Sequence, residues 1–418
     1  MWTRLLDKLV RGLVHHGRLV VEYPDGHRAE YGDGRGQPVV MRITDPAVPR
    51  RIMASPELGL GEAYMDGTLT IENDDLAGLI ALLFLNREGR SGAWLQAPSH
   101  AARWLRRRYD QVNSAASARS NVAHHYDLSQ ALYDSFLDRD RQYSCAYFPT
   151  GHETLEDAQE AKKHLIARKL LLKPGMRVLD IGCGWGGMAL TLAREYGAQV
   201  VGVTLSRDQH RIATERAEAA GLTGQVEFRL QDYRAVPETF DRIVSVGMFE
   251  HVGVPQYRTY FGSVREHLAP DGVALVHTIG RMLPPGTTSP WIRKYIFPGG
   301  YIPALSETAA AIERESLWIT DIEVLRLHYA ETLNRWYGRF MDAVSDPEMR
   351  AEVPILDDER FVRMWRFYLI ASELTFRHGG HDVFQIQLAR DQEAVPLTRD
   401  YMFDRTGTTA QARKHAAE

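Results

Sequence analysis

One run of residues, Asp180-Ile181-Gly182-Cys183-Gly184-Trp185-Gly186-Gly187, constrains the fold of this chain more than any other. It follows Arg177–Ile181, an apolar stretch typical of a buried strand, and precedes Met188–Tyr196, a stretch with helical spacing. Glycines let the backbone turn sharply at the end of a strand and let a ligand come close. The run therefore predicts a strand, a ligand-binding loop and a helix in succession.

The same alternation of strand and helix continues after the loop. Further strands are predicted over Gln199–Thr204, Val226–Leu230, Phe240–Val246 and Gly272–Thr278, and helices over Asp208–Ala220 and Tyr257–Leu268. The last strands are expected near Trp318–Leu327 and Val383–Arg390. Alternation at this spacing predicts an α/β fold with a doubly wound parallel sheet.

The first part of the chain has a different pattern. Leucines at helical spacing in Leu5–Leu13, strand-like runs in Gly17–Thr44 and an apolar helix over Leu76–Leu85 predict a small α+β unit. We expect an N-terminal α+β domain over residues 1–86, a basic linker over 87–121, a Rossmann-like domain over 122–395 with a cap insertion around 287–337, and a C-terminal tail over 396–418.

Composition excludes several classes of protein. The net charge of −4 over 418 residues gives no basic excess for nucleic acid. The two cysteines, Cys145 and Cys183, are too few for a disulfide framework and fit a reducing cytoplasm. The N-terminus has no signal-peptide pattern, and the longest uncharged apolar run, Leu76–Leu85, is shorter than the ~20 residues of a membrane span. We expect a cytoplasmic protein without a metal site.

Two residues of the loop region decide between cofactors. Gly182, Gly184 and Gly187 also match the dinucleotide pattern G-x-G-x-x-G. However, Asp180 would repel a pyrophosphate, whereas it suits a ligand with an amino acid end and a sulfonium. The second strand ends at Thr204 without the carboxylate that holds the ribose of NAD. The sequence therefore predicts S-adenosylmethionine, with an NAD-dependent oxidoreductase and a glycine turn without ligand as the alternatives.

Polar residues after the next strands complete the predicted cofactor site. Thr204 and Gln209 offer neutral hydrogen bonds to a ribose, and Gln231-Asp232-Tyr233 follows the third strand in position to bind an adenine. Ligands in open α/β sheets bind outside the carboxyl ends of the strands. Glu250 and His277, which follow the fourth and fifth strands, should therefore face the same crevice as the glycine loop.

Three other residues are candidates for the chemistry. Glu250 follows the fourth strand, His277 lies at the end of the fifth, and Cys145 lies upstream in an aromatic segment. Cys145 alone suits a small buried side chain, and His277 alone suits a hydrogen-bonded histidine at a strand end. Glu250 is harder to explain structurally, because a carboxylate in an apolar turn is unfavourable unless it is paired.

Together, several short motifs resemble those of the cyclopropane-fatty-acyl-phospholipid synthases, relatives of the mycolic acid cyclopropane synthases. Besides the glycine loop, they are Gly61-Glu62-Ala63-Tyr64-Met65-Asp66-Gly67, His125-Tyr126-Asp127-Leu128, Tyr143-Ser144-Cys145-Ala146-Tyr147-Phe148, Gly247-Met248-Phe249-Glu250-His251-Val252-Gly253, His277-Thr278-Ile279-Gly280 and Tyr295-Ile296-Phe297-Pro298. The resemblance runs from about residue 59 to about 390. It implies a class I methyltransferase domain, a lipid-carrier-like N-terminal domain and a homodimer.

The resemblance also implies a reaction and its residues. The alkene of an unsaturated acyl chain of a phospholipid takes the sulfonium methyl and becomes a carbocation, a bound bicarbonate removes a proton, and a cyclopropane ring closes. The bicarbonate would be held by Cys145, Glu250, His277, the backbone of Ile279, and Tyr329. The cofactor would be bound by Tyr143, Ser144, Asp180, Gly182, Gly184, Thr204, Gln209, Gln231 and Asp232.

One position departs from the family pattern. Many members have a cysteine near the C-terminus, where this chain has Ser372. A C-methyltransferase that makes a methyl- or methylene-branched chain from the same cation therefore stays open as an alternative. A lipid-binding protein that keeps the fold without catalysis is a further alternative.

A substrate in a bilayer implies contact with the inner membrane surface. Two basic segments are candidates for docking on anionic headgroups: the helix around Leu5–Leu13 and the cluster Arg103, Arg106, Arg107 and Arg108. The alternative is that the helix packs on its own domain and that the arginines are only solvated.

Overall fold

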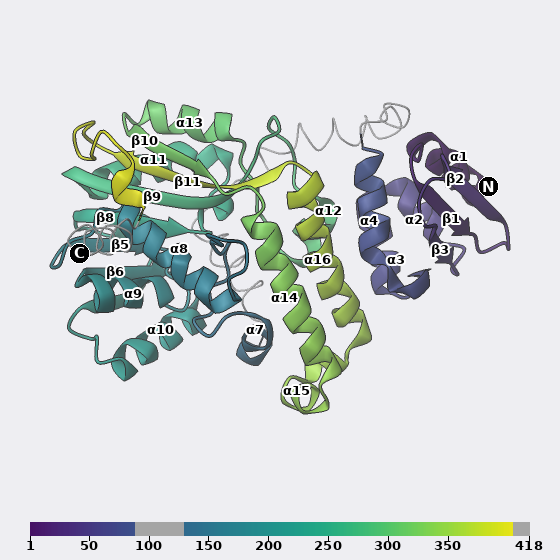
Figure 1. Cartoon of the computed structure of the whole chain (residues 1–418), viewed down its shortest axis with the longest axis horizontal. Helices are drawn as coiled ribbons and strands as arrows, with labels where there is room; N and C mark the ends of the chain where they lie inside the picture. Colours follow the sequence, from purple (N-terminus) through teal and green to yellow (C-terminus); the bar gives the residue numbers. More distant parts are fainter. Residues whose placement is uncertain (88–128, 404–418) are drawn as a thin grey trace, which may run out of the picture.

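The protein was analysed as a computed structural model that describes residues 1–87 and 129–403. Two sheets organise this part of the chain (Figure 1). The expected linker at 87–121, its arginine cluster and the His125–Leu128 motif lie almost entirely outside the described residues. No helix within 1–87 and 129–403 has the length and apolar character to cross a membrane.

The N-terminal unit is a four-stranded sheet covered by helices, as the sequence predicts. Its strands, in the order β2-β1-β3-β4, are β1 (Arg18–Glu22), β2 (Arg28–Gly32), β3 (Val39–Ile43) and β4 (Leu69–Ile71). Its helices are α1 (Trp2–Leu13), α2 (Val48–Ala54), α3 (Pro56–Met65) and α4 (Leu76–Leu85). Leu6 and Leu9 of α1 are buried in this unit, whereas Trp2 and Leu5 are exposed.

The second unit is a seven-stranded sheet in the order β10-β11-β9-β8-β5-β6-β7. Its strands are β5 (Arg177–Ile181), β6 (Gln199–Thr204), β7 (Val226–Leu230), β8 (Phe240–Val246), β9 (Leu268–Arg281), β10 (Trp318–Val324) and β11 (His381–Ala389). Its helices are α7 (Gln130–Phe136), α8 (Leu155–Lys169), α9 (Gly187–Tyr196), α10 (Arg207–Ala219), α11 (Tyr257–His267), α12 (Pro290–Tyr295), α13 (Leu305–Arg314), α14 (His328–Ser345), α15 (Pro347–Glu352) and α16 (Glu359–His378).

The sheet is not parallel throughout, which differs from the sequence-based expectation. β5, β6, β7, β8 and β9 run parallel, whereas β11 is antiparallel to both β9 and β10. The reason is the excursion of α14 and α16: the chain leaves the sheet after β10 and returns to the same point, where the Leu325 amide donates to the Val383 carbonyl (2.9 Å). A strand that starts where its neighbour ended must run in the opposite direction.

The expected cap segment, residues 287–337, contributes α12, α13, β10 and the first half of α14. The expected tail begins at 396; of its residues up to 403, Tyr401 hydrogen-bonds Gln387 and Met402 is buried, whereas Leu397 and Phe403 are exposed. The α14–α16 pair lies between the seven-stranded sheet and the N-terminal helices (Figure 1).

The motif from Gly61 to Gly67 forms part of the contact between the two units, in which α3 and α4 also pack on α16. Gly61 of α3 packs on Trp291 of α12, and the Trp291 indole donates to the Met65 sulfur (3.2 Å). Glu62 accepts from Lys294 (2.6 Å) and from the Tyr295 hydroxyl (2.9 Å). The motif therefore serves to hold the N-terminal unit against the larger one.

This packing predicts a large effect of a single methyl group. A Cβ at Gly61 would lie 2.5 Å from the Trp291 ring. Gly61→Ala should therefore lower the free energy of unfolding by about 1–3 kcal/mol through overpacking. Gly338→Ala is the matched control, because Gly338 also lies in a helix, and a Cβ there would meet no described atom within 4 Å beyond its own helix backbone. Equal midpoints of thermal unfolding for the two variants would contradict this account of the interface.

Candidate active site

The glycine loop connects β5 to α9 at the carboxyl end of the sheet. Gly182, Gly184 and Gly186 all have positive φ (80°, 55° and 85°), so side chains at these positions would be strained. The amides of Gly182 and Cys183 donate to the carbonyl of Val203 (3.0 and 3.1 Å), which ties the loop to the end of β6. The loop is thus held open rather than folded over the strand ends.

A cavity lies over this loop. Its wall includes all nine residues predicted to bind the cofactor: Tyr143, Ser144, Asp180, Gly182, Gly184, Thr204, Gln209, Gln231 and Asp232. They come from β5 and the loop that follows it, from the end of β6 and the start of α10, from the segment after β7, and from the segment that precedes α8. The structure therefore brings together residues that are up to 89 positions apart in the sequence (143 to 232).

Asp180 is the charged group at the base of the cavity. Its side chain is buried, and its Oδ2 atom has no hydrogen-bond partner in the described structure. Burial raises the pKa of Asp180 to about 7, and the positive charge of Lys162 opposes that rise. A buried carboxylate without a protein partner is unfavourable, so the site is suited to a cationic ligand.

The opposite end of the cavity carries neutral and paired groups. The Thr204 hydroxyl donates to Gln209 Oε1 (3.0 Å), and both side chains are buried. Asp232 forms an ion pair with Arg234 (2.6 Å). The Tyr233 ring lies edge-on to Tyr260, with centroids 5.6 Å apart. Hydroxyl, amide and carboxylate groups beside an aromatic ring suit the ribose and base of a nucleoside.

Tyr143 and Ser144 belong to an extended segment, residues 138–148, which we call the strap. The Tyr143 hydroxyl hydrogen-bonds that of Tyr368 (3.0 Å), and its ring packs against Tyr133 and Trp336. The amide of Ala146 donates to the Thr332 hydroxyl (3.0 Å). The strap is therefore attached to α14 and α16 on one side while its residues face the cavity on the other.

A second polar cluster lies where β8 and β9 end; Glu250 and His277 are not themselves in the cavity wall, although His251, next to Glu250, is. Oε1 of Glu250 accepts from the amide of Ile279 (2.7 Å), while Oε2 is buried with no partner in the described structure. Burial raises the pKa of Glu250 to about 7, and the Ile279 hydrogen bond opposes that rise. This carboxyl group can therefore gain or lose a proton near neutral pH.

His277 is a neutral member of this cluster. It is two residues from Ile279 on β9, and its Nδ1 lies 3.1 Å from the Gln385 amide nitrogen. Burial holds the pKa of His277 well below its usual value. Gln385 in turn accepts from Lys169 (2.7 Å), so the imidazole is oriented by a chain of hydrogen bonds.

The other two residues predicted for bicarbonate lie on the strap and on α14. Cys145 is buried, its thiol donates to the Ala146 carbonyl (3.2 Å), and burial raises its pKa. Tyr329 is in the first turn of α14, packed against Trp336 and Phe376. The Ala146–Thr332 hydrogen bond places the Cys145 segment beside the same turn of α14.

Some residues of the cavity wall, Gln142 and His251 among them, were not among the predicted site residues, and neither was Lys162 behind the wall. His251 lines the cavity, and burial lowers its pKa to about 4, so the ring is neutral. Lys162 of α8 is fully buried and donates to Ser144 (2.8 Å). His251 directly follows Glu250 in the sequence, and this could have identified it as a site residue. Lys162 could not be identified in this way, because it lies in a helix whose charged residues resemble those of a solvated surface. Ser372 is in α16 and does not line the cavity.

No group of three or more metal-ligating side chains lies close enough to hold a metal ion within 1–87 and 129–403.

Comparison with known proteins agrees with this geometry. The sequence model of the mycolic acid cyclopropane synthetase family matches residues 113–386, and a domain of unknown function matches residues 5–91. The cyclopropane-fatty-acyl-phospholipid synthase of Escherichia coli K12 is 41% identical over 85% of this chain and 89% of its own. The tuberculostearic acid methyltransferase UfaA1 of Mycobacterium tuberculosis is 37% identical over 93% of this chain and 91% of its own.

Solved structures show the same likeness. The mycolic acid cyclopropane synthase CmaA1, complexed with SAH and CTAB, superposes with a TM-score of 0.59 at 33% identity, covering 65% of this chain and 97% of that one. The fold, the glycine loop and the cavity above it define a class I S-adenosylmethionine-dependent methyltransferase. Within that class, the chain belongs to the mycolic acid cyclopropane synthetase family and is a homologue of the cyclopropane-fatty-acyl-phospholipid synthases.

The buried Asp180 predicts opposite effects on stability and on ligand binding. Because burial raises its folded-state pKa to about 7, the free protein loses stability as pH rises from about 4 to 7. Asp180→Asn should therefore raise the melting temperature of the free protein at pH 8, while it weakens S-adenosylmethionine binding.

For the wild type, affinity for S-adenosylmethionine should fall by up to tenfold per pH unit below about pH 7, as Asp180 takes up a proton. The Asn variant should lack this dependence. Calorimetry at pH 6 to 8.5 and thermal melting measure both effects. Parallel pH profiles for the wild type and the variant would show that Asp180 is not the titrating group.

Proposed function

We propose that this protein forms cyclopropane rings in membrane phospholipids. It would transfer the methyl carbon of S-adenosylmethionine to the double bond of an unsaturated fatty acyl chain. The proposal rests on the buried carboxyl group of Glu250, one oxygen of which has no hydrogen-bond partner in the described structure. The next residue, His251, lies in the wall of the cofactor cavity. Family membership and the 41% identity to the E. coli synthase support it.

The cavity fits the cofactor by charge. Asp180 would attract the cationic amino acid end, Thr204 and Gln209 would bond the ribose, and Asp232 and Gln231 would lie at the nucleoside end. The SAH-bound relative supports this assignment. Tyr143 and Ser144, at the strap, would complete the cofactor site.

The second cluster fits a bicarbonate ion. Oε2 of Glu250 has no hydrogen-bond partner in the described structure. Because the pKa of Glu250 is about 7, its protonated form is accessible and can donate a hydrogen bond to an anion. His277 and Cys145 add neutral polar groups. The Ile279 amide already donates to Glu250, so an anion would share that donor. Bicarbonate bound here would supply the base for the final proton transfer.

The aromatic surroundings fit a cationic intermediate. Rings of Tyr133, Phe136 and Trp336 pack around Tyr143, and Tyr329 packs on Trp336. Electron-rich faces stabilise a cation by about 0.5–2 kcal/mol each, and a cavity that excludes water protects it from hydroxylation.

The reaction balances without an oxidant or reductant. The alkene electron pair forms a bond to the methyl carbon as the carbon–sulfur bond breaks, with its electrons left on sulfur as S-adenosylhomocysteine. The resulting carbocation loses one proton from the transferred methyl group, and the freed pair closes the ring. The chain's own residues orient the base and surround the cation.

A branched-chain product is the second candidate. The tuberculostearic acid methyltransferase is 37% identical over 93% of this chain, and its name specifies a methyltransferase. Ser372, in place of the family's cysteine, is compatible with either product. A methylene-branched chain forms from the same cation by a 1,2-hydride shift and loss of a proton, whereas a saturated methyl branch would also need an external hydride donor.

Access to lipid, assembly and domain organisation complete the proposal. The protein would act at the cytoplasmic face of the inner membrane as a peripheral homodimer, with residues 1–86 as the lipid-binding and dimerisation domain. Exposed Trp2 and Leu5 on α1, beside Arg4 and Lys8, support a surface contact.

Proton NMR of the product lipid tests the reaction. Purified protein, S-adenosylmethionine and vesicles of an unsaturated phospholipid should yield cyclopropane methylene protons far upfield. Mass spectrometry alone does not suffice, since a cyclopropane and a methylene-branched chain both add one carbon and two hydrogens. Turnover without the upfield signal would replace the first candidate by the second, and no turnover would contradict both.

Glu250→Gln tests the second cluster. It removes the ionisable group while keeping a similar shape, so turnover should fall by about 10²-fold or more, as for a lost electrostatic contact in a buried site. Affinity for S-adenosylmethionine should stay within about threefold. Glu215→Gln, on the exposed face of α10, is the control and should keep full turnover. Equal loss of affinity and turnover in Glu250→Gln would assign this residue to cofactor binding or to the fold.

A further inference from the structure

Three polar side chains of α8 lie buried against the strap. Gln159, Lys162 and Lys163 are at most 1% exposed, and their spacing puts them on one face of the helix. Fully buried lysines are rare unless they are paired. The two lysines are paired differently, which allows their roles to be separated.

The first set of contacts fixes the strap beside the cofactor cavity. Gln159 Nε2 donates to the carbonyls of Gln142 (3.1 Å) and Ser144 (3.0 Å). Lys162 Nζ donates to Gln142 Oε1 (2.7 Å) and to the Ser144 hydroxyl (2.8 Å). Both Gln142 and Ser144 line the cavity, so the Lys162 ammonium lies directly behind its wall.

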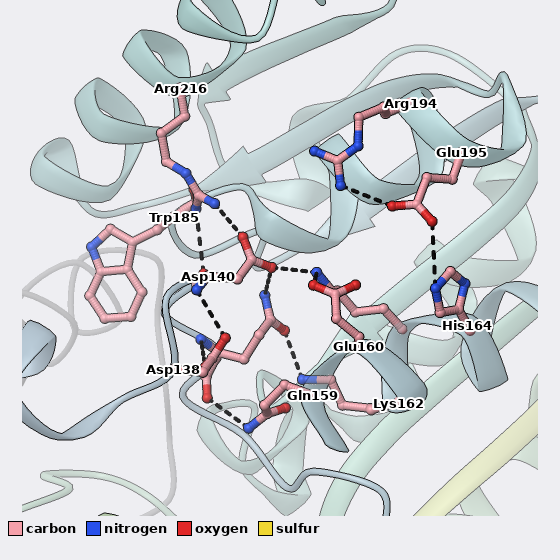
Figure 2. Close-up of polar contacts among 12 residues, drawn as sticks. Asp138, Asp140, Gln159, Glu160, Lys162, His164, Trp185, Arg194, Glu195 and Arg216 are labelled. Carbon is pink, nitrogen blue, oxygen red and sulfur yellow. Dashed lines mark hydrogen bonds and ion pairs between the residues drawn. The ribbon is translucent and has the colours of Figure 1, made fainter. Parts of the chain in front are cut away.

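A second set of contacts surrounds Asp140, which is not itself in the cavity wall (Figure 2). Asp140 accepts from Lys163 (2.7 Å) and from Gln142 Nε2 (3.1 Å), and it pairs with Arg216. Arg216 also donates to the carbonyl of Trp185 in the glycine loop (2.6 Å). Lys163 thus belongs to an ion-pair network that ties the strap to the loop.

The positive charge of Lys162 influences titratable groups in both the proposed cofactor site and the proposed bicarbonate site. It opposes the burial-driven rise in the pKa of Asp180 and of Cys145, and it adds to the burial-driven lowering of the pKa of His277. Lys162 faces Asp138 and Asp140 of the strap, Cys145, and Lys163 of its own helix. Burial lowers the pKa of Lys162 to about 8, so the ammonium form persists at neutral pH.

We propose that Lys162 is a positioning residue: its ammonium group holds Ser144 and Gln142 in the cavity wall and supplies the positive charge that favours the ionised form of Asp180. The inference rests on the proposed cofactor site. In this proposal, a residue of α8 that does not line the cavity determines both the shape and the charge of the cofactor pocket.

The matched pair Lys162→Met and Lys163→Met tests this assignment. Both variants remove one buried ammonium from the same helix, and both should lower the melting temperature. Only Lys162→Met should weaken S-adenosylmethionine binding at pH 7.5, by about tenfold. Only Lys162→Met should move the acidic midpoint of the affinity profile to higher pH, by about one unit, the size expected for a lost opposite charge.

Calorimetry across pH 6 to 8.5 provides the readout. If the methionine variant does not fold, Lys162→Gln, which keeps a polar group toward Ser144, carries the same test. Wild-type binding with an unchanged midpoint in the Lys162 variants, or equal shifts for Lys162 and Lys163, would overturn the inference. Failure of the wild type to bind S-adenosylmethionine would instead overturn the proposed function.

Discussion

Asp180 and Glu250 each carry a carboxyl oxygen that is buried with no hydrogen-bond partner in the described part of the chain. Leaving such a group unsatisfied costs about 1–3 kcal/mol, and more when it is charged. Burial raises the pKa of both to about 7. Two such groups are tolerated in a fold when a bound ligand supplies the missing hydrogen-bond or charge partner. Here both groups lie at the carboxyl end of one sheet.

The surrounding elements bury these two carboxyl groups and carry the other polar side chains of the site. The α14–α16 excursion supplies the aromatic side chains around Tyr143 and carries Tyr329. The strap contributes another part of the cavity wall and is held by hydrogen bonds from side chains of α8. The N-terminal unit packs on α12 through Gly61 and Glu62, and Pro298 and Gly299, a few residues after α12, line the cavity.

Much of this could be predicted from sequence because local rules decide it. The glycine loop follows a buried strand, so its position at the carboxyl end of the sheet follows from the topology of a Rossmann-like fold, as do the neighbouring Thr204, Gln209, Gln231 and Asp232. Tyr143 and Ser144 lie upstream of this sheet, and only the family resemblance implied them. The antiparallel course of β11 could not be predicted, because it depends on where α16 returns the chain. Lys162 was missed for a related reason: helical periodicity marks a polar face but does not tell whether water or a buried segment covers it.

A crystal structure of the protein with S-adenosylhomocysteine in bicarbonate buffer tests the proposed active site most directly. We expect the homocysteine end beside Asp180 and the nucleoside beside Thr204 and Asp232, with a planar anion in contact with Glu250 Oε2. A nucleoside bound elsewhere, or a Glu250 carboxyl group that remains unpartnered while the cofactor site is filled, would contradict it.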